Sequence, residues 1–225
     1  MQPEGQINQW REQFLSFPVA PMKYPGATRI LGETSDKSFL VEWRKRVGDQ
    51  EADRITNESI VIGESLDSIV RHHFLDPDFV KTDYEGQPGY DLYRSLRPWL
   101  NRVKPISLQC ELWSERMGVR GFPDIIGTID NGPLVVIDIK NARSTRRREW
   151  ITDYFLQCTM YAMMVHDTLG ISIRDIAIFM GDRSRISSPQ IFMEKTHEYV
   201  RPVLERIAQY RRSNHCAENY PGLAR

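Results

Sequence analysis

The sequence contains little cysteine. Its three cysteines, Cys110, Cys158 and Cys216, are odd in number and lie far apart in the chain. Such a set does not form a disulfide framework, and it lacks the close spacing by which cysteines bind a structural metal. We therefore expect a fold that depends on neither disulfides nor a cysteine-bound metal.

Long apolar runs are also lacking. No stretch of about 18 or more apolar residues occurs, so we expect no membrane span. The first residues, Met-Gln-Pro-Glu-Gly-Gln, have neither the basic start nor the apolar centre of a signal peptide, and a cytoplasmic protein is expected. The chain has 225 residues, of which 40% are hydrophobic, and this favours one domain with a substantial core.

Net charge is the third property that the sequence lacks, since 30 basic residues balance 30 acidic ones. Many proteins that bind nucleic acid are basic overall, so the balance weighs mildly against that class. A local cluster can still attract phosphate. We expect this of the arginine run, which consists of Arg143, Arg146, Arg147 and Arg148, with a solvated loop as the alternative.

Hydrophobic periodicity divides the chain into helices and strands. It predicts helices at residues 7–17, 36–47, 49–73, 90–100, 153–169 and 194–212. It predicts strands at 105–115, 176–180 and 189–192, a hairpin within 121–140, and a loop at 81–90. This order indicates an α/β fold with a mixed β-sheet flanked by helices.

We expect residues 1–225 to form a single domain. It would consist of an N-terminal arm (1–23), a mainly helical part (24–104), a core (105–195), and a C-terminal helix and tail (196–225).

The hairpin carries charged residues at fixed positions on two apolar runs. Asp124 opens the first run, and Asp138 and Lys140 close the second. Residues two apart on a strand share a face, so Asp138 and Lys140 project to the same side. An unpaired buried carboxylate is costly, so these acids either pair with basic groups or bind a cation. Mg²⁺ takes carboxylate and phosphate oxygens, and a nearby lysine can orient or deprotonate a water and offset phosphate charge.

The turn of the hairpin decides whether the two acids meet. A two-residue loop at 131–132 would place Asp124 opposite Ile139, on the other face of the sheet from Asp138. A three-residue loop at 130–132 would place Asp124 directly across from Asp138. These residues suit a type I turn followed by Gly132 in the left-handed region. We therefore predict the three-residue loop, or a bulge near Asp124 with the same effect.

The pattern Pro-Asp, spacer, Asp-x-Lys resembles that of the PD-(D/E)XK nuclease superfamily. Further segments resemble its RecB-like branch, and are most similar to phage exonucleases related to the mitochondrial genome maintenance exonuclease. A short acidic pattern alone recurs by chance, whereas motifs in the expected order are specific. The resemblance covers roughly residues 24–195. The matching segments are Tyr24–Leu31, Trp43, Gly63–Asp67, Pro123-Asp124, Asp138-Ile139-Lys140 and Gln157–Tyr161.

The resemblance implies a metal-dependent DNA exonuclease that acts on single-stranded ends, with Asp124, Asp138 and Lys140 as catalytic residues. Mg²⁺, or Mn²⁺ in its place, would be held by Asp67, Asp124, Asp138 and the backbone carbonyl of Ile139. Gln157, Tyr161 and the arginine run would contact DNA. An iron–sulfur cluster is not expected, because it needs four cysteine ligands. We expect a monomer, in the host cytoplasm if a phage encodes it.

Two positions depart from the pattern of the family. Asp67 stands where relatives usually carry histidine. Aspartate is also a suitable Mg²⁺ ligand, and Glu64, one turn earlier on the same helix face, is the alternative. Asn141 follows the lysine in place of the usual threonine, which puts a supporting hydrogen bond in doubt.

Other residues allow two interpretations. Gln157 and Tyr161 lie on one helix face that either looks toward DNA or is half-buried. Glu111 either lines the site or pairs with a buried basic group. Trp150 and Tyr154 either stack on bases or pack in the core. The five histidines have no metal-binding spacing, and we expect them on the surface.

Two other functions remain open. A site-specific endonuclease with the same core usually needs an element that reads duplex DNA. No helix dense in Arg and Asn is evident, but a loop could serve instead. An inactive DNA-binding module would have lost part of the acid–lysine set, which is complete here.

Overall fold

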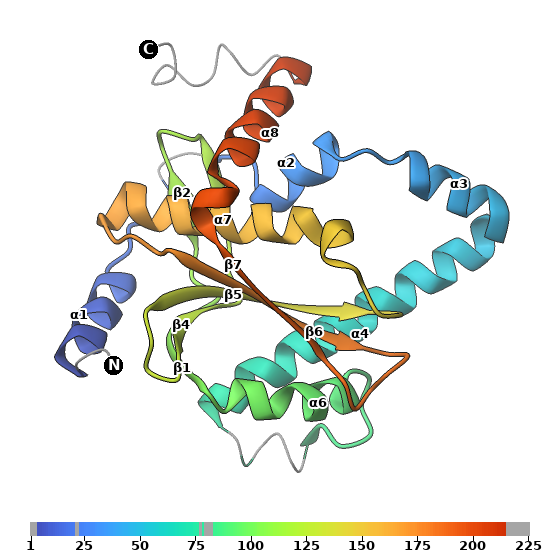
Figure 1. The fold of residues 1–225 in the computed structure, drawn as a ribbon, viewed down its shortest axis with the longest axis horizontal. Helices are drawn as coiled ribbons and strands as arrows, with labels where there is room; N and C mark the ends of the chain where they lie inside the picture. Colours follow the sequence, from blue (N-terminus) through green and yellow to red (C-terminus); the bar gives the residue numbers. More distant parts are fainter. Residues whose placement is uncertain (1–3, 21–22, 77, 79–82, 215–225) are drawn as a thin grey trace.

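A five-stranded sheet in the order β1-β4-β5-β6-β7 forms the centre of the fold (Figure 1). Strands β5 and β6 are parallel and the other neighbours are antiparallel. The α/β class with a mixed sheet flanked by helices is therefore confirmed. The sheet strands are β1 (Val103–Leu108), β4 (Ile125–Ile129), β5 (Leu134–Ala142), β6 (Asp175–Asp182) and β7 (Gln190–Lys195); β2 (Leu112–Ser114) and β3 (Val119–Gly121) form a separate pair.

The structure, a computed structural model, describes residues 4–20, 23–76, 78 and 83–214. Cys216, the tail from residue 215 onward, residues 1–3 and residues 81–82 of the expected loop lie outside the described residues. The helices are α1 (Glu4–Leu15), α2 (Ala27–Thr34), α3 (Ser38–Val47), α4 (Asp49–Leu75), α6 (Tyr90–Leu100), α7 (Thr152–Leu169) and α8 (Val200–Ser213), with short 3₁₀ turns at Arg148–Ile151 and Thr196–Glu198. None of these described helices is long and apolar enough to cross a membrane.

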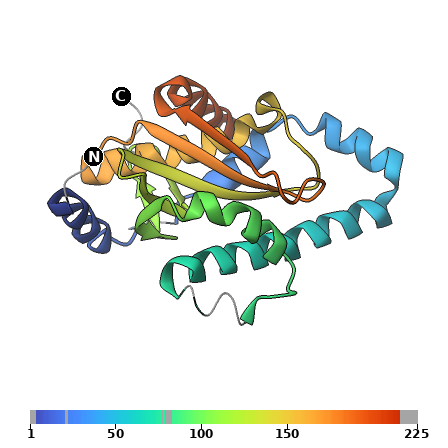
Figure 2. The ribbon, with the colours of Figure 1, turned by 60° about the horizontal axis from the view of Figure 1, so that its bottom comes forward.

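Helices cover both faces of the sheet (Figure 2). On one face, Val136 of β5 packs in a core shared with α2, α7 and α8; on the other, Ile137 and Ile139 pack against α4 and α6. β5 is central and borders a parallel strand, so it is buried on both faces and reads as a continuous apolar run. A charged residue in β5 is therefore forced into the interior of the protein.

Several expected boundaries are wrong. The strand expected at 105–115 ends at Leu108, and the chain then enters β2, which pairs with β3 instead. The closing helix does not begin at Glu194, because residues 190–195 pair with β6 as β7. Helix α2, over Ala27–Thr34, was not expected.

The histidines are not all on the surface. His73 is buried, and its ring lies 3.0 Å from the Tyr93 hydroxyl. Burial lowers the pKa of His73 below its ordinary value, so the neutral ring is favoured.

Candidate active site

The β4–β5 hairpin brings Asp124 across from Asp138. The register pairs Ile125 with Ile137 and Ile126 with Val136, so the position before Ile125 lies opposite Asp138. This is the register of a three-residue loop at 130–132, and the prediction is confirmed. Opposed residues share a face of the sheet, so Asp124, Asp138 and Lys140 lie on the side of the sheet that faces α7.

The conformation of that loop differs from the expected one. Positive φ angles occur at Asp130 (51°) and Asn131 (54°), while Gly132 is not in the left-handed region. The Gly132 amide donates to the carbonyl of Ile129 at 2.8 Å. Asp and Asn tolerate the left-handed region better than other non-glycine residues, so the turn forms without that use of glycine.

Asp138 and Lys140 form a buried ion pair beneath α7. The Lys140 Nζ atom lies 2.6 Å from Asp138 Oδ2, and the Asp138 side chain is 1% exposed. The amide of Gln157, on α7, approaches the other oxygen, Oδ1, at 3.4 Å. Apart from the ion pair, Oδ2 accepts no hydrogen bond within the part of the chain that the structure describes.

Asp124 lies at the level of the Ile139 backbone. Its Oδ2 accepts a hydrogen bond from the Ile139 amide at 2.6 Å. Burial, with the charge of Asp138 as the second cause, raises the pKa of Asp124 to about 7. Burial also raises the pKa of Asp138, although Lys140 opposes it.

Lys140 is the basic residue paired with this buried acidic pair. Burial alone would lower the pKa of Lys140, but the charges of Asp138 and Asp124 raise it above its ordinary value. Lys140 therefore stays protonated near neutral pH. Two ionised carboxylates around one ammonium leave an excess negative charge, which a cation would offset.

Asp67 approaches the same site from α4. Both of its carboxylate oxygens accept from Gln109 Nε2, at 2.7 and 2.8 Å, and its charge contributes to raising the pKa values of Asp124 and Asp138. Glu64 is exposed and makes no such contribution. Asp67, rather than Glu64, is thus the acid of α4 whose charge acts on the acidic pair.

Gln109 is a residue of the site that the sequence did not reveal. Its side chain holds Asp67, and its backbone amide donates to the Asp124 carbonyl at 3.1 Å. It also has a positive φ of 48°, just after β1 ends. No motif marks this glutamine, because its role depends on the meeting of α4 with the sheet.

The donor set fits a hard divalent cation. In the described ranges, no three His, Cys, Asp or Glu side chains come close enough to form a metal site by themselves, since Asp67 is turned to Gln109. The two opposed carboxylates and the Ile139 carbonyl remain, and Mg²⁺ is usually bound through one or two carboxylates and keeps several waters. Oxygen donors with excess negative charge suit Mg²⁺ or Mn²⁺ better than a thiophilic metal.

Gln157 and Tyr161 lie between this site and a cavity. The Gln157 amide donates to the Tyr161 hydroxyl at 2.9 Å, and both side chains are buried. They line a cavity of about 330 Å³ together with Gly26–Thr28 and Arg120–Phe122. The Tyr24–Leu31 segment is thereby brought to the site, although its spacing gave no reason to expect this.

The arginine run is divided between different environments. Arg148 forms an ion pair with Glu194 and donates to the Tyr199 hydroxyl at 2.9 Å. The Arg147 guanidinium lies 5.3 Å from the ring centre of Trp150. Trp150 is 63% exposed, and so is not a core residue.

Arg146 and Arg143 lie nearer to the end of β5. The Arg146 backbone amide and carbonyl bond to the side chain of Gln190, at 2.7 and 2.8 Å. Arg143 and Arg146 both line a cavity beside α3 and α4.

The other ambiguous residues have defined partners. Glu111 pairs with Arg120 at 3.3 Å. Tyr154 packs against the core, with the Lys140 ammonium 5.1 Å from its ring centre. Asn141 donates to the Ser59 carbonyl of α4 at 3.3 Å.

Comparisons with known proteins give no family for this chain. No protein-family model matches it, and no curated protein matches it. Among solved structures, a candidate exonuclease from Eubacterium rectale is 14% identical with a TM-score of 0.47, over 72% of this chain and 68% of its own. The protein SSO0001 is 14% identical with a TM-score of 0.39, over 92% and 85%. Similarity at this level does not bear on activity.

Proposed function

We propose that this chain is a metal-dependent deoxyribonuclease that hydrolyses phosphodiester bonds, acting as an exonuclease on single-stranded DNA ends. One observation carries the proposal: the hairpin register sets Asp124 opposite Asp138, with Lys140 on the same face. An apolar side chain in place of any of these three would satisfy the fold at lower cost, because buried charges are expensive. The preference for single-stranded ends is taken from the family resemblance.

In the proposed mechanism, the residues divide the work by position. Asp124, Asp138 and the Ile139 carbonyl would hold Mg²⁺, with Asp67 contributing if it is released from Gln109. When bound, Mg²⁺ lowers the pKa of a water and offsets charge on the phosphate. Lys140, held protonated by the two carboxylates, would orient the attacking water and balance charge on a non-bridging phosphate oxygen.

Digestion assays test the proposal most directly. The wild-type chain should shorten an end-labelled single strand in Mg²⁺ or Mn²⁺ and not in EDTA, and should leave closed single-stranded circles intact. Cutting of circles or of duplex at internal positions would favour an endonuclease. Binding without cleavage in any metal would favour an inactive binding module.

Lys140→Ala separates catalysis from binding. It should abolish cleavage and leave DNA affinity within a few-fold, because the other DNA contacts remain. The matched control is Lys195→Ala, which removes a half-exposed lysine of β7 that pairs with Asp175 of β6 and should keep full activity. A Lys140→Ala protein that digests DNA at the wild-type rate would refute the assigned mechanism.

A further inference from the structure

A helical projection extends from the body of the protein beside the candidate active site. It consists of α3 and the first part of α4, residues 38–58, and both ribbon views show it reaching beyond the sheet (Figures 1 and 2). None of the residues of α3, all of which the structure describes, is buried. Phe39 is 66% exposed and Leu40 is 51% exposed.

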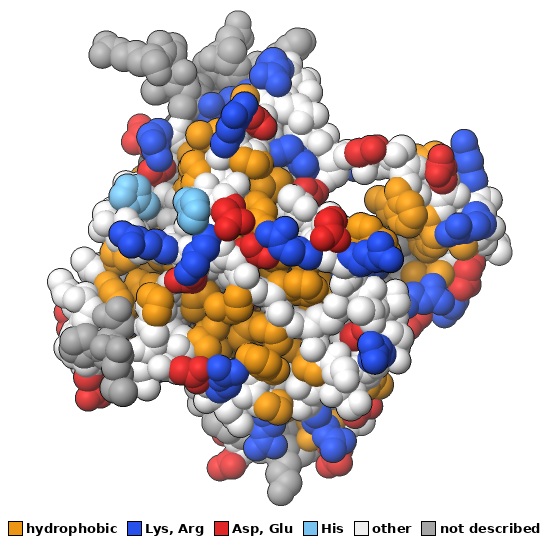
Figure 3. All heavy atoms as spheres, in the orientation of Figure 1, with side chains coloured by type: hydrophobic (Ala, Val, Ile, Leu, Met, Phe, Trp, Pro, Cys, Tyr) orange, Lys and Arg blue, Asp and Glu red, His pale blue; other side chains and the backbone are white. Residues whose placement is uncertain are grey.

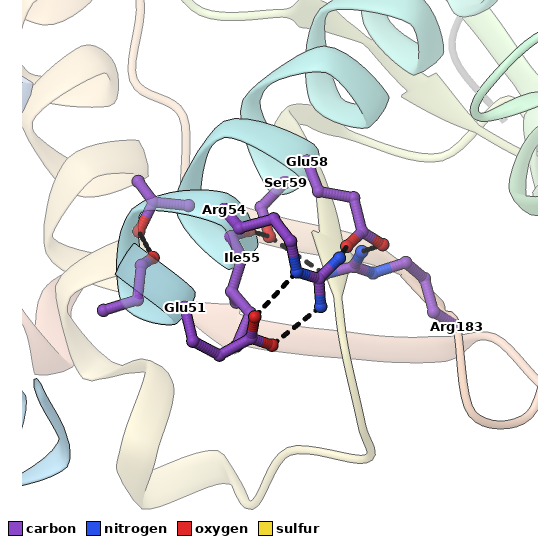
Figure 4. A network of polar contacts seen from close by, with 8 residues as sticks. Glu51, Arg54, Ile55, Glu58, Ser59 and Arg183 are labelled. Atoms are coloured by element: carbon purple, nitrogen blue, oxygen red, sulfur yellow. Dashed lines mark hydrogen bonds and ion pairs between the residues drawn. The ribbon is translucent and has the colours of Figure 1, made fainter. Parts of the chain in front are cut away.

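The projection is held at a defined place. Arg183, which follows β6, donates to Glu58 at 2.8 Å and to the Ser59 hydroxyl at 2.9 Å (Figure 4). Asn141, at the end of β5, donates to the Ser59 carbonyl. These contacts fix the middle of α4 on the ends of the two parallel strands, so α3 stands at a set distance from the sheet.

A groove lies between the projection and the body. Its volume is about 480 Å³, and we call it the projection groove. Phe39, Leu40 and Trp43 line it from α3, while Arg143 and Arg146 line it from the body. In the space-filling view, hydrophobic side chains gather on the projection, and side chains of both Lys or Arg and Asp or Glu lie around them (Figure 3).

The charge of the groove has one sign. Its lining includes Arg143, Arg146 and Arg183 and no carboxylate. Among the described residues, the guanidinium groups of Arg143 and Arg146 make no ion pair, in contrast to that of Arg183, which pairs with Glu58. The groove therefore offers positive charge opposite an exposed aromatic surface, and Glu51 of α4 is close enough to Arg143 for that charge to help lower the pKa of Glu51.

The groove lies at the end of β5 that carries the candidate active site. Asn141 and Ala142, which line it, directly follow Lys140 in β5. A strand whose phosphate lies at Lys140 can therefore place its neighbouring nucleotides in the groove.

We propose that the projection groove binds the unpaired bases of single-stranded DNA, with Phe39 and Trp43 stacking on bases and Arg143 and Arg146 contacting phosphates. This inference rests on the proposed nuclease function and names the surface that holds its substrate. Aromatic side chains facing a basic groove are how proteins bind single strands without sequence preference. A duplex does not suit this surface, because its bases are paired and stacked on each other.

Binding of a single-stranded oligonucleotide, measured by fluorescence anisotropy in EDTA, tests the proposal. Phe39→Ala should weaken binding by about 5- to 150-fold, the usual effect of losing one base–aromatic stack. Phe39→Trp should restore it, because the stacking face returns. The matched control is Val41→Ala on the same helix, an exposed residue outside the groove lining, which should bind like the wild type.

Photocrosslinking gives an independent readout. An oligonucleotide containing 5-iodouridine should form its adduct on Phe39 or Trp43, as located by mass spectrometry of the digested complex. Adducts confined to other segments, or wild-type affinity in Phe39→Ala, would overturn the proposal. So would a wild-type dimer in sedimentation that Phe39→Ala converts to monomer, because α3 would then contact a second copy.

The two proposals fail separately. Hydrolysis of a small chromogenic phosphodiester, thymidine 5′-p-nitrophenyl phosphate, needs the active site and not the groove. Phe39→Ala should retain this hydrolysis while losing oligonucleotide affinity. The nuclease function alone would be overturned if the wild-type protein cleaved neither substrate and Phe39→Ala still weakened oligonucleotide binding.

Discussion

Asp124 and Asp138 are buried like charges that share a single lysine. Each would be more stable in water, and their repulsion adds to the cost of burial. The Ile139 amide and the Lys140 ammonium recover part of this energy. The remaining cost is what a bound cation would remove, so the metal-free site is a local source of instability.

Asp124→Asn should therefore stabilise the metal-free protein. Asn can still accept the Ile139 hydrogen bond but carries no charge. The pKa of Asp124 is about 7 in the folded protein against 3.8 for the ordinary group. Between these two pH values the folded protein keeps a proton that the unfolded chain has lost, so the stability of the wild type falls as pH rises from 3.8 to about 7. The stability advantage of Asn over Asp, measured by urea unfolding in EDTA, should grow from near zero at about pH 4 to at most roughly 4 kcal/mol above about pH 7. An advantage that shrinks as pH rises would show that Asp124 is not buried against a like charge.

Gly121 controls the position of Tyr161 through close contact. A Cβ atom at residue 121 would lie 2.2 Å from Tyr161 Cε1. Gly121→Ala should displace the ring, cost about 1–3 kcal/mol of stability, and lower cleavage because Tyr161 positions Gln157 beside Asp138. Gly32→Ala is the control, since nothing lies within 4 Å of its Cβ position in α2, and it should gain about 0.5–1 kcal/mol. Equal unfolding curves for Gly121→Ala and the wild type would contradict the contact.

At the scale of elements, the segment after β5 combines residues of different kinds. Arg148 is committed to Glu194 and Tyr199, whereas Arg147 and Arg146 keep their guanidinium groups near the surface. Phosphate binding is therefore a property of particular arginines of the run rather than of the run as a unit.

Salt titrations of DNA affinity should resolve these arginines. Arg146→Ala and Arg147→Ala should each flatten the slope of log K against log salt by up to ~0.7, the value for one lost single-strand phosphate contact. Arg148→Ala should leave the slope unchanged and cost up to about 1 kcal/mol of stability, since it is half-exposed. Unchanged slopes in Arg146→Ala and Arg147→Ala would show that these arginines do not contact phosphate and belong to a solvated loop.

Helix α4 belongs to two environments, and Ser59 marks the boundary. Its later residues, including Leu66 and Ile69, pack against the sheet, while its first turns are part of the projection. The rigidity of the groove thus depends on the contacts that Arg183 and Asn141 make near Ser59.

Arg183→Ala should loosen the projection without unfolding the body. Amide hydrogen exchange should accelerate across residues 38–58 and stay unchanged in β5 and β6, because only the attachment is lost. Arg54→Ala is the matched control, since Arg54 pairs with Glu51 and Glu58 within α4 itself (Figure 4). Exchange that rises equally in both variants would show that Arg183 is not the attachment point.

At the scale of the whole molecule, local patterns predicted local structure well. Tyr90–Leu100 was expected as a helix with the bounds that α6 has, and the residues of the turn predicted the hairpin register. Both depend on residues close in sequence. The pairing of Asp138 with Lys140 also followed from the two-residue period of a strand.

Long-range structure was not accessible in the same way. Apolar alternation from Ile106 to Leu112 does not show that the chain changes sheets after Leu108, because both sheets accept the same pattern. Gln109 joins the site only because α4 lies beside the end of β1. The pairing of Arg148 with Glu194 likewise depends on the position of β7 beside β6.

Metal binding should stabilise the entire fold, because the site is assembled from α4 and two strands that are separate in the unfolded chain. A ligand that binds only the folded state adds about 2.7 kcal/mol when its free concentration is a hundred times Kd. Urea unfolding should show this gain for Mg²⁺ in the wild type, with NaCl at equal ionic strength as the reference. Asp138→Asn should lose the gain, while Arg146→Ala, which alters the groove and not the ligands, should keep it. A gain in stability of the same size in NaCl, or in Asp138→Asn, would show that the cation stabilises the protein without binding at Asp138. Lys140 alone would then compensate the charge of the buried acids.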